Sequence, residues 1–176
     1  MKPVSIFSAA VLLVPWTALF AREPQFPPVE GFELQRYLGT WYEIARMPNW
    51  FERDLVNVTA TYSPRDDGKI TVLNQGYKPG QDGKRKQARG RAKFAGDPAT
   101  GHLKVSFFGP FYANYIIIDL DKADYQYALV AGSKHKFLWI LSRTPQMDEA
   151  LYNRLVAYAT ELGFDPEKLY KVPQNW

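Results

Sequence analysis

The sequence predicts an all-β protein, an eight-stranded up-and-down antiparallel barrel with one C-terminal α-helix packed outside it. Three observations support this prediction: turn sequences recur at near-regular intervals, strand-like runs fill the intervals, and one amphipathic segment follows the last run. The 176 residues suffice for one domain with a good core, but not for two comfortable ones. Aromatic residues make up 15%, and 12 Gly with 13 Pro supply the turns.

Eight runs have the length and composition of strands. They cover residues 41–47, 56–63, 69–77, 86–94, 102–108, 115–120, 125–131 and 137–143, and residues 169–172 look like a short last strand. Because the connections are short, successive strands should pair as antiparallel hairpins. A barrel of eight strands encloses side chains or one small ligand. The alternative is a sandwich whose second sheet fills that space.

The run 86–94 favours an open interior. Ala88, Gly90 and Ala92 share one face with Phe94, whereas Gln87, Arg89, Arg91 and Lys93 share the other. If the small residues face inward, they leave space instead of filling it.

One helix is predicted at about residues 147–162. Thr144 and Pro145 break the chain before Asp148, a suitable N-cap. Apolar residues then recur at helical spacing, at Met147, Leu151, Leu155, Ala159 and Leu162, and Gly163 provides the stop. A helix with one apolar face must lie against the outside of the sheet.

The N-terminus has the pattern of a secretory signal. Lys2 precedes an apolar run at 4–14, and Ala21 follows at a suitable cleavage position, so residues 1–21 are predicted to be removed. The alternative is an apolar N-terminal helix that stays in the fold. Residues 22–32 are Pro-rich and read as an extended arm before a barrel domain at 33–176. We therefore expect a periplasmic protein, with or without outer-membrane association; no lipobox Cys is present.

Composition argues against several function classes. A net charge of +4 is too mild for a dedicated nucleic-acid binder. Without Cys there is no disulfide, thiolate nucleophile or Cys-based metal site. The two His residues, His102 and His135, are too few for a histidine-rich metal site and stand in no recognisable Ser-His-Asp context. We expect no enzyme activity, no metal and no cofactor.

Three motifs together resemble the lipocalin family. Gly39-Thr40-Trp41 resembles its Gly-x-Trp signature, DKADY at 121–125 resembles its second motif, and Arg143 in WILSR resembles the third. Their order and separation span almost the whole chain after residue 21. The phrases WYEIAR, TATYS, KVSFFGPF and LWILSRTP are similar to bacterial lipocalins and their relative apolipoprotein D. The resemblance implies a non-enzymatic carrier from a branch whose members are typically outer-membrane lipoproteins.

Alternation of the loops places two of these motifs together. In a meander, the first strand starts at the barrel end where the eighth finishes, so Trp41 and Arg143 should meet there. A guanidinium can stack on an indole face and close the base. We therefore interpret Gly39, Trp41 and Arg143 as a structural plug and not as a ligand site.

The same alternation places four loops at the open end, at 48–57, 78–84, 109–113 and 132–136. Trp50, Phe51, Phe111 and Tyr112 should ring this mouth, sheltered by a bound apolar ligand or by a membrane surface. The alternative is that Trp50 and Phe51 fold down as a lid on the base of their own loop.

Charge divides between the two ends. The mouth loops carry Arg53, Lys78, Lys84, Lys134 and Lys136 against Glu52, Asp54 and Asp82, and Arg85 with Lys86 raise their sum to +4. The closed-end loops carry Arg65 and Lys122 against Asp66, Asp67, Asp97, Asp121 and Asp124, a sum of −3. Such a molecule should approach an anionic lipid surface mouth first. Scattered loop lysines that serve only solubility are the alternative.

Strand alternation and the resemblance together suggest the pocket. Phe137 and Trp139 lie an even number of residues before Arg143 on the predicted strand, so they should face inward as Arg143 does. The resemblance to apolipoprotein D suggests Tyr62, Asn74, Phe107 and Trp139, and their parity adds Val58, Ala60 and Val72. One Asn among aromatic residues suits a fatty carboxyl or a glycerol head. Plain core packing is the alternative for each residue.

The expected function is non-enzymatic binding, storage or transport of a lipophilic ligand in the bacterial cell envelope. A fatty acid or lysophospholipid is the expected partner, and the protein should be a monomer or weak homodimer. Two alternatives remain open: a carrier of another small hydrophobic molecule, and a surface interaction or assembly protein with a filled barrel. The latter would use the outer stripe of Arg89, Arg91 and Lys93.

Overall fold

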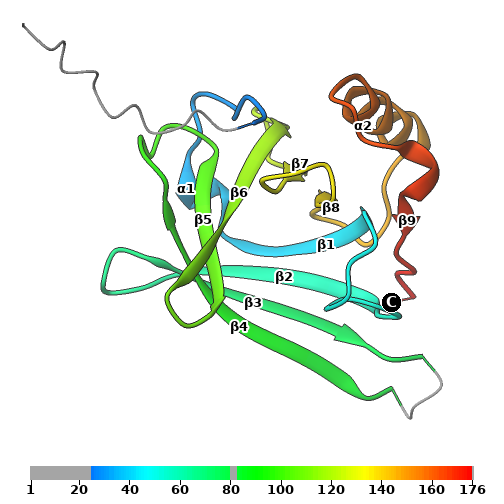
Figure 1. The fold of residues 1–176 in the computed structure, drawn as a ribbon, viewed down its shortest axis with the longest axis horizontal. Coiled ribbons are helices and arrows are strands. Elements are labelled where there is room, and N and C mark those ends of the chain that lie inside the picture. Colours follow the sequence, from blue (N-terminus) through cyan, green and yellow to red (C-terminus); the bar gives the residue numbers. More distant parts are fainter. Residues whose placement is uncertain (1–24, 80–82, 176) are drawn as a thin grey trace, which may run out of the picture.

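Nine strands and two α-helices form the fold in the computed structural model, which describes residues 25–79 and 83–175 (Figure 1). The predicted signal at 1–21 lies outside the described residues, as do the first part of the arm and Asp82. The elements are α1 Leu34–Tyr37, β1 Gly39–Arg46, β2 Val56–Pro64, β3 Ile70–Tyr77, β4 Arg85–Phe94, β5 His102–Phe108, β6 Phe111–Leu120, β7 Tyr127–Ala131, β8 Leu138–Ser142, α2 Glu149–Glu161 and β9 Tyr170–Lys171.

The predicted closed antiparallel barrel is confirmed. Each of β2 to β8 pairs with its neighbour in sequence, and β1 pairs with both β2 and β8, which closes the sheet. The two-residue strand β9 pairs with the far end of β1 at Ala45 and Arg46. Closure satisfies the backbone groups that edge strands would leave open.

Several strand boundaries differ from the prediction by one or more residues, and turn chemistry explains the differences at the starts of β6 and β7. Strand β6 starts at Phe111 and not at 115, because the tight turn at Gly109, with φ of 55°, lets Phe108 pair with Phe111. Strand β7 starts at Tyr127 and not at 125. The Asp121 carboxylate accepts backbone N–H groups of the following turn, and Tyr125 has a φ of 55°.

The predicted helix is confirmed as α2, which lies outside the barrel (Figure 1). The Asp148 side chain accepts from the Leu151 N–H at 3.0 Å and caps its first turn. Gly163 follows the helix with a φ of 89°, a conformation that glycine adopts without strain. Leu155 and Ala159 are buried against the outer face of the sheet.

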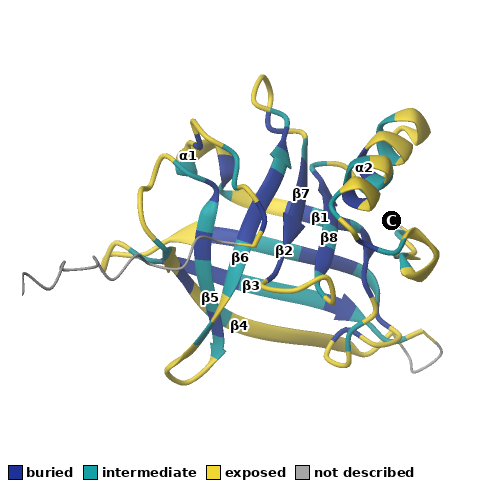
Figure 2. Cartoon of the chain, turned by 45° about the horizontal axis from the view of Figure 1, so that its top comes forward, coloured by how far each residue is buried: buried dark blue, intermediate teal, exposed yellow. Residues whose placement is uncertain are grey.

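The barrel strands contribute to two hydrophobic cores, one inside the barrel and one between its outer face and α2. Inside, Trp41, Val130 and Leu141 belong to one buried cluster, whereas Leu129 and Ile140 belong to the cluster under α2. Strands β7 and β8 are therefore buried on both sides, while β4 is exposed along most of its length (Figure 2). The outer core thus lies under α2, on one flank of the barrel.

The ends of the described chain seal the remaining gaps. Phe26 of the arm packs against Phe164 with ring centroids 5.1 Å apart, and Phe32 joins the inner cluster at the closed end. At the other end, Gln174 donates from Nε2 to the carbonyl oxygens of Glu43 (2.8 Å) and Val58 (3.0 Å). This amide bridges β1 and β2 beyond the point where their direct pairing stops.

Arg143 and Trp41 close the base of the barrel together. The Arg143 guanidinium lies 3.9 Å from the Trp41 ring centroid and donates to the carbonyl oxygens of Arg36 (2.7 Å), Thr40 (3.0 Å) and Tyr125 (3.2 Å). One side chain therefore links α1, β1 and the β6–β7 turn. Gly39 has a φ of 95°, and a Cβ there would lie 3.4 Å from Arg143 Nη1.

Replacing Arg143→Ala should destabilise the fold by roughly 2–4 kcal/mol, because three hydrogen bonds from a charged donor and one cation–π contact are lost together. Urea unfolding followed by circular dichroism measures the change. Lys122→Ala, an exposed cation at the same end, is the control and should change little. Equal stability of the two variants would contradict a closing role for Arg143.

Candidate ligand-binding site in the barrel

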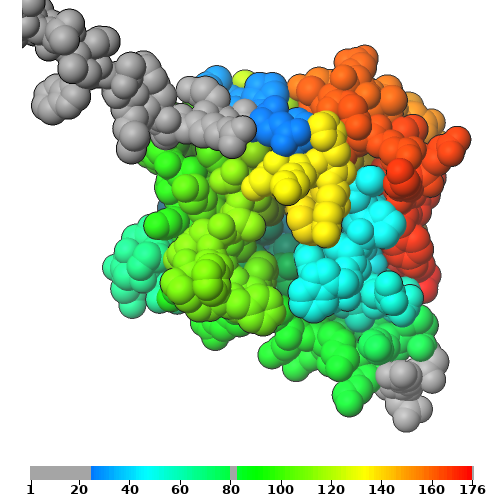
Figure 3. All heavy atoms as spheres, viewed as in Figure 1, coloured from blue at the N-terminus to red at the C-terminus, as the bar shows by residue number. Residues whose placement is uncertain are grey.

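The mouth half of the barrel interior is lined by small residues on three strands. Ala60 on β2 pairs with Asn74 on β3, which pairs with Ala88 on β4, so the three lie in one row on the inner face. Although these side chains face inward, Ala88 is exposed and Ala60 and Asn74 are only half-buried. Solvent therefore reaches the interior here, and Figure 3 shows a hollow between the β5–β6 hairpin, the β7–β8 loop and the β1–β2 loop.

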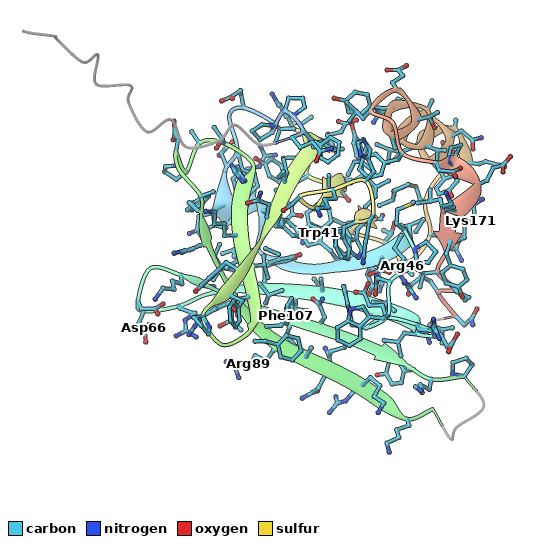
Figure 4. The ribbon with its side chains drawn as sticks, in the orientation of Figure 1. Trp41, Arg46, Asp66, Arg89, Phe107 and Lys171 are labelled. Carbon is cyan, nitrogen blue, oxygen red and sulfur yellow. The ribbon has the colours of Figure 1, made fainter. Side chains whose placement is uncertain are left out.

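The next inward position on β4, Gly90, pairs with Val72 and has no side chain, and an aromatic ring of β5 lies over it. A Cβ at Gly90 would come within 2.8 Å of the Phe107 ring, so only glycine lets that ring cross β4. Figure 4 labels Phe107 on β5. The ring is half-buried and packs against the inner cluster.

The closed half of the interior is filled. Trp41, Tyr62, Val72 and Leu141 are buried there. Phenol hydroxyls cross this region in a chain, with Tyr115 Oη 2.7 Å from the hydroxyls of both Tyr37 and Tyr62. Burial is the largest cause that raises the pKa of the Tyr37, Tyr62 and Tyr115 phenols, so all three stay neutral and can donate hydrogen bonds.

The sequence-predicted pocket residues divide between the filled floor and the open half. Tyr62 and Val72 are floor residues, whereas Ala60, Phe107 and Trp139 are half-buried against the floor cluster. Val58 lies over Gly76 in a small separate cluster with Leu55 and Val172. Asn74 differs from the others: its Oδ1 is buried and has no hydrogen-bond partner among the described residues.

A column of four aromatic rings runs from the mouth into the interior. Trp50 meets Phe51 edge-on at 5.6 Å, Phe51 stacks on Phe137 at 6.3 Å, and Phe137 stacks on Trp139 at 6.0 Å with 6° between the planes. Trp50 is 72% exposed and Phe51 is 45% exposed. Phe51 therefore contacts the facing β7–β8 connection as well as its neighbour in its own loop.

The other two aromatic residues expected at the mouth lie in different places. Phe111, at the tip of the β5–β6 hairpin, is 80% exposed, and its pairing partner Phe108 is 72% exposed. Tyr112 faces the outside of the barrel, where Lys93 Nζ lies 4.7 Å from its ring centroid. The reason is alternation: Ala113 pairs with Val105 on the inner face, which turns Tyr112 outward.

Three buried charged residues in the open half were missed by the sequence reasoning. Arg46 Nη1 donates to Glu43 Oε1 at 2.7 Å, and Arg46 Nε lies 4.0 Å from Glu52 Oε2. Because side chains alternate along a strand and Trp41 faces inward, the sequence could have predicted that Glu43 also faces inward. It could not predict Arg46, because an irregularity between Glu43 and Ala45 turns Arg46 to the face of Trp139. Glu52, counted as a mouth charge from sequence, is 5% exposed and points into the barrel.

Burial raises the pKa of the Glu43 carboxyl well above its ordinary value, and the nearby charge of Glu52 acts in the same direction. The Arg46 guanidinium opposes both effects but does not outweigh them. The cluster contains one cation, Arg46, and two carboxyl groups, so it is electrically neutral when Glu43 is protonated.

The remaining chemistry of the described residues is sparse. His135 Nε2 lies 2.8 Å from the Leu162 carbonyl oxygen, and His102 Nε2 lies 3.3 Å from Asn114 Oδ1. Within residues 25–79 and 83–175, no group of three or more acidic or histidine side chains could hold a metal ion. No helix in those ranges is long and apolar enough to cross a membrane.

Sequence comparison identifies a family and near relatives. A model of the lipocalin-like domain matches residues 32–174. The chain is 53% identical over 146 residues to the outer membrane lipoprotein Blc of Citrobacter freundii, covering 83% of this chain and 81% of that protein. Blc of Vibrio cholerae is 47% identical over 175 residues, with 99% and 100% covered. Mouse apolipoprotein D is 35% identical over 158 residues, with 84% and 80% covered.

Solved structures share the fold at lower identity. Insecticyanin from the tobacco hornworm Manduca sexta superposes with a TM-score of 0.68 at 22% identity, covering 85% of this chain and 84% of that one. Lobster apocrustacyanin A1 gives a TM-score of 0.63 at 21% identity, with 81% and 79% covered. At this identity the likeness concerns the fold alone.

The raised pKa of Glu43 predicts a specific pH dependence of stability. An unfolded Glu titrates near 4.5, so above that pH the unfolded chain releases a proton that the folded chain still holds. The free energy of unfolding should therefore fall as pH rises toward the folded pKa of Glu43. Urea unfolding at a series of pH values measures this slope. Glu43→Gln should flatten it, whereas Glu30→Gln on the exposed arm should not; an identical slope in both variants would contradict the assignment.

Proposed function

The chain belongs to the lipocalin family, whose members bind small hydrophobic ligands, and from this premise we propose that it carries an amphiphile with one long acyl chain. A fatty acid or a lysophospholipid fits this description. The observation that carries the proposal is the open half of the barrel. There the small side chains of Ala60 and Ala88 leave space, and Phe107 and Trp139 supply apolar walls.

Size and polarity both favour such a ligand. Each CH₂ group that leaves water contributes roughly 0.8 kcal/mol, so a long chain gives ample affinity without a covalent step. Asn74 adds one buried amide oxygen that has no partner among the described residues. Pockets of this class combine apolar walls with a few polar groups that fix orientation. A hydroxyl or glycerol group on the ligand would satisfy Asn74.

The relatives support a place in the bacterial envelope. The Citrobacter and Vibrio proteins carry the name outer membrane lipoprotein. We propose that this chain works in the periplasm, where a carrier would move amphiphiles to or from the outer membrane. Binding without catalysis is the simplest role for the polar groups of this interior, because they pair with one another.

The mouth would meet a membrane surface during loading. Trp50, Phe108 and Phe111 are large apolar side chains that are each at least 72% exposed. Exposed cations flank them at Lys84, Arg85, Lys86, Lys134 and Lys136. Aromatic side chains partition to membrane interfaces, and each nearby cation contributes about 1 kcal/mol at an anionic surface. Together they favour a mouth-first approach.

Filling the open half should abolish carriage. Ala88→Trp places a large ring in the row of small residues and should weaken displacement of a fluorescent fatty acid by oleate or lysophosphatidylcholine at least tenfold. Gln87→Trp is the matched control, since the neighbouring residue faces outward on the same strand. Equal ligand binding by the two variants would rule out a site in the barrel, and absence of binding by the wild-type chain would rule out the carrier function.

Reversing the mouth charges should reduce docking. Changing Lys84, Arg85, Lys134 and Lys136 together to Glu should lower binding to anionic phosphatidylglycerol vesicles at least tenfold in a sedimentation assay. The control reverses four cations on the outer face of the sheet, Arg89, Arg91, Lys93 and Lys104. A similar loss in both variants would mean that attraction is not directed through the mouth.

A further inference from the structure

Glu52 is a buried acid at the centre of the loop between β1 and β2, whose two ends, Met47 and Leu55, are also buried. Its neighbours Phe51, Arg53 and Asp54 are all exposed, whereas Glu52 is 5% exposed. Burying an ionised carboxylate is costly unless hydrogen bonds and opposite charge compensate it. Between its apolar ends, the mouth loop is therefore held by the contacts of this one polar side chain.

Hydrogen-bond donors from three directions converge on Glu52. Its Oε2 accepts from Asn49 Nδ2 at 2.6 Å and from Trp139 Nε1 at 3.1 Å. Arg46 Nη2 donates to its carbonyl oxygen, and the Glu52 N–H donates back to Asn49 Oδ1 at 2.9 Å. Trp139 stands on β8 and Arg46 ends β1, so Glu52 ties the mouth loop to two strands of the wall (Figure 4 labels Arg46).

The same contacts determine the charge inside the barrel. Arg46 is the buried cation of the described residues, and the buried carboxyls are Glu43 and Glu52. The Tyr170 ring covers the guanidinium from β9 at 5.1 Å, and Tyr62 is the other titratable group that senses both carboxyls. With both acids in place, Arg46 has no charge to spare for an anionic group on a ligand.

We propose that Glu52 positions the mouth loop and Trp139 and, by occupying Arg46, determines how strongly the barrel discriminates against a charged ligand head. The inference rests on the proposed carrier function and adds a selectivity to it. A ligand whose head is neutral can place that head beside Trp139, whereas a carboxylate meets the charge of Glu52 and a guanidinium that this charge already neutralises. Removing the Glu52 charge leaves Arg46 with one partner and an interior more favourable to anions.

A pair of ligands with the same chain isolates the effect of charge. Affinities for laurate and 1-dodecanol are measured at neutral pH by displacement of a fluorescent fatty acid, and their ratio is compared between variants. Glu52→Gln keeps an acceptor for Trp139 Nε1 but removes the charge, and it should shift the ratio toward laurate roughly fivefold or more. Asp54→Asn removes a charge from an exposed position of the same loop, where φ is 61°, and should leave the ratio within about twofold.

A second variant separates position from charge. Glu52→Asp keeps the carboxylate but shortens its reach, so the loop should loosen while the charge remains. Trypsin cleavage after the exposed Arg53 should then be at least fivefold faster than in wild type. A merely structural role would change the cleavage rate but not the laurate-to-dodecanol ratio.

The outcomes distinguish this inference from the function on which it rests. If wild type binds neither laurate nor dodecanol, the carrier function itself fails. If wild type binds both and Glu52→Gln leaves their ratio unchanged, carriage stands and the selectivity role of Glu52 is overturned. Wild-type cleavage rates in Glu52→Asp would overturn its role in positioning the loop.

Discussion

Strand β1 carries the constraint on which the rest of the structure depends, because it pairs on one side with β2 and on the other with β8. That double pairing closes the sheet and assigns an inside and an outside to every strand. Trp41 then faces the closed end, where Arg143 covers its ring. The irregularity after Glu43 changes the alternation once, and it brings Arg46 to the inner face beside Trp139.

The barrel interior has two halves with different physics. The closed half is packed with large apolar side chains and neutral phenols, so its contribution is stability. In the open half, Ala60 and Ala88 present small side chains, and the aromatic column from Trp50 to Trp139 forms one wall. The two halves therefore differ in how far large side chains fill them.

Buried charge makes the open half more than an apolar slot. Glu43, Arg46 and Glu52 are compensated within the protein, by a 2.7 Å ion pair and by hydrogen bonds that reach into the mouth loop. Such a network stabilises little compared with an apolar core of the same volume, but it fixes geometry. The loop that carries Trp50 and Phe51 is therefore exposed at its tip and held at its base.

Sequence alone determined the fold, the helix with its Asp148 cap and the inward face of β4, because turn residues and hydrophobic periodicity are local signals. It also predicted the family through three separated motifs. Only the tertiary structure decided where Glu52 and Arg46 point and that Tyr112 lies outside. A strand irregularity shifts alternation by one residue, and a loop side chain follows long-range partners such as Trp139. Neither effect can be predicted from the local periodicity of the sequence.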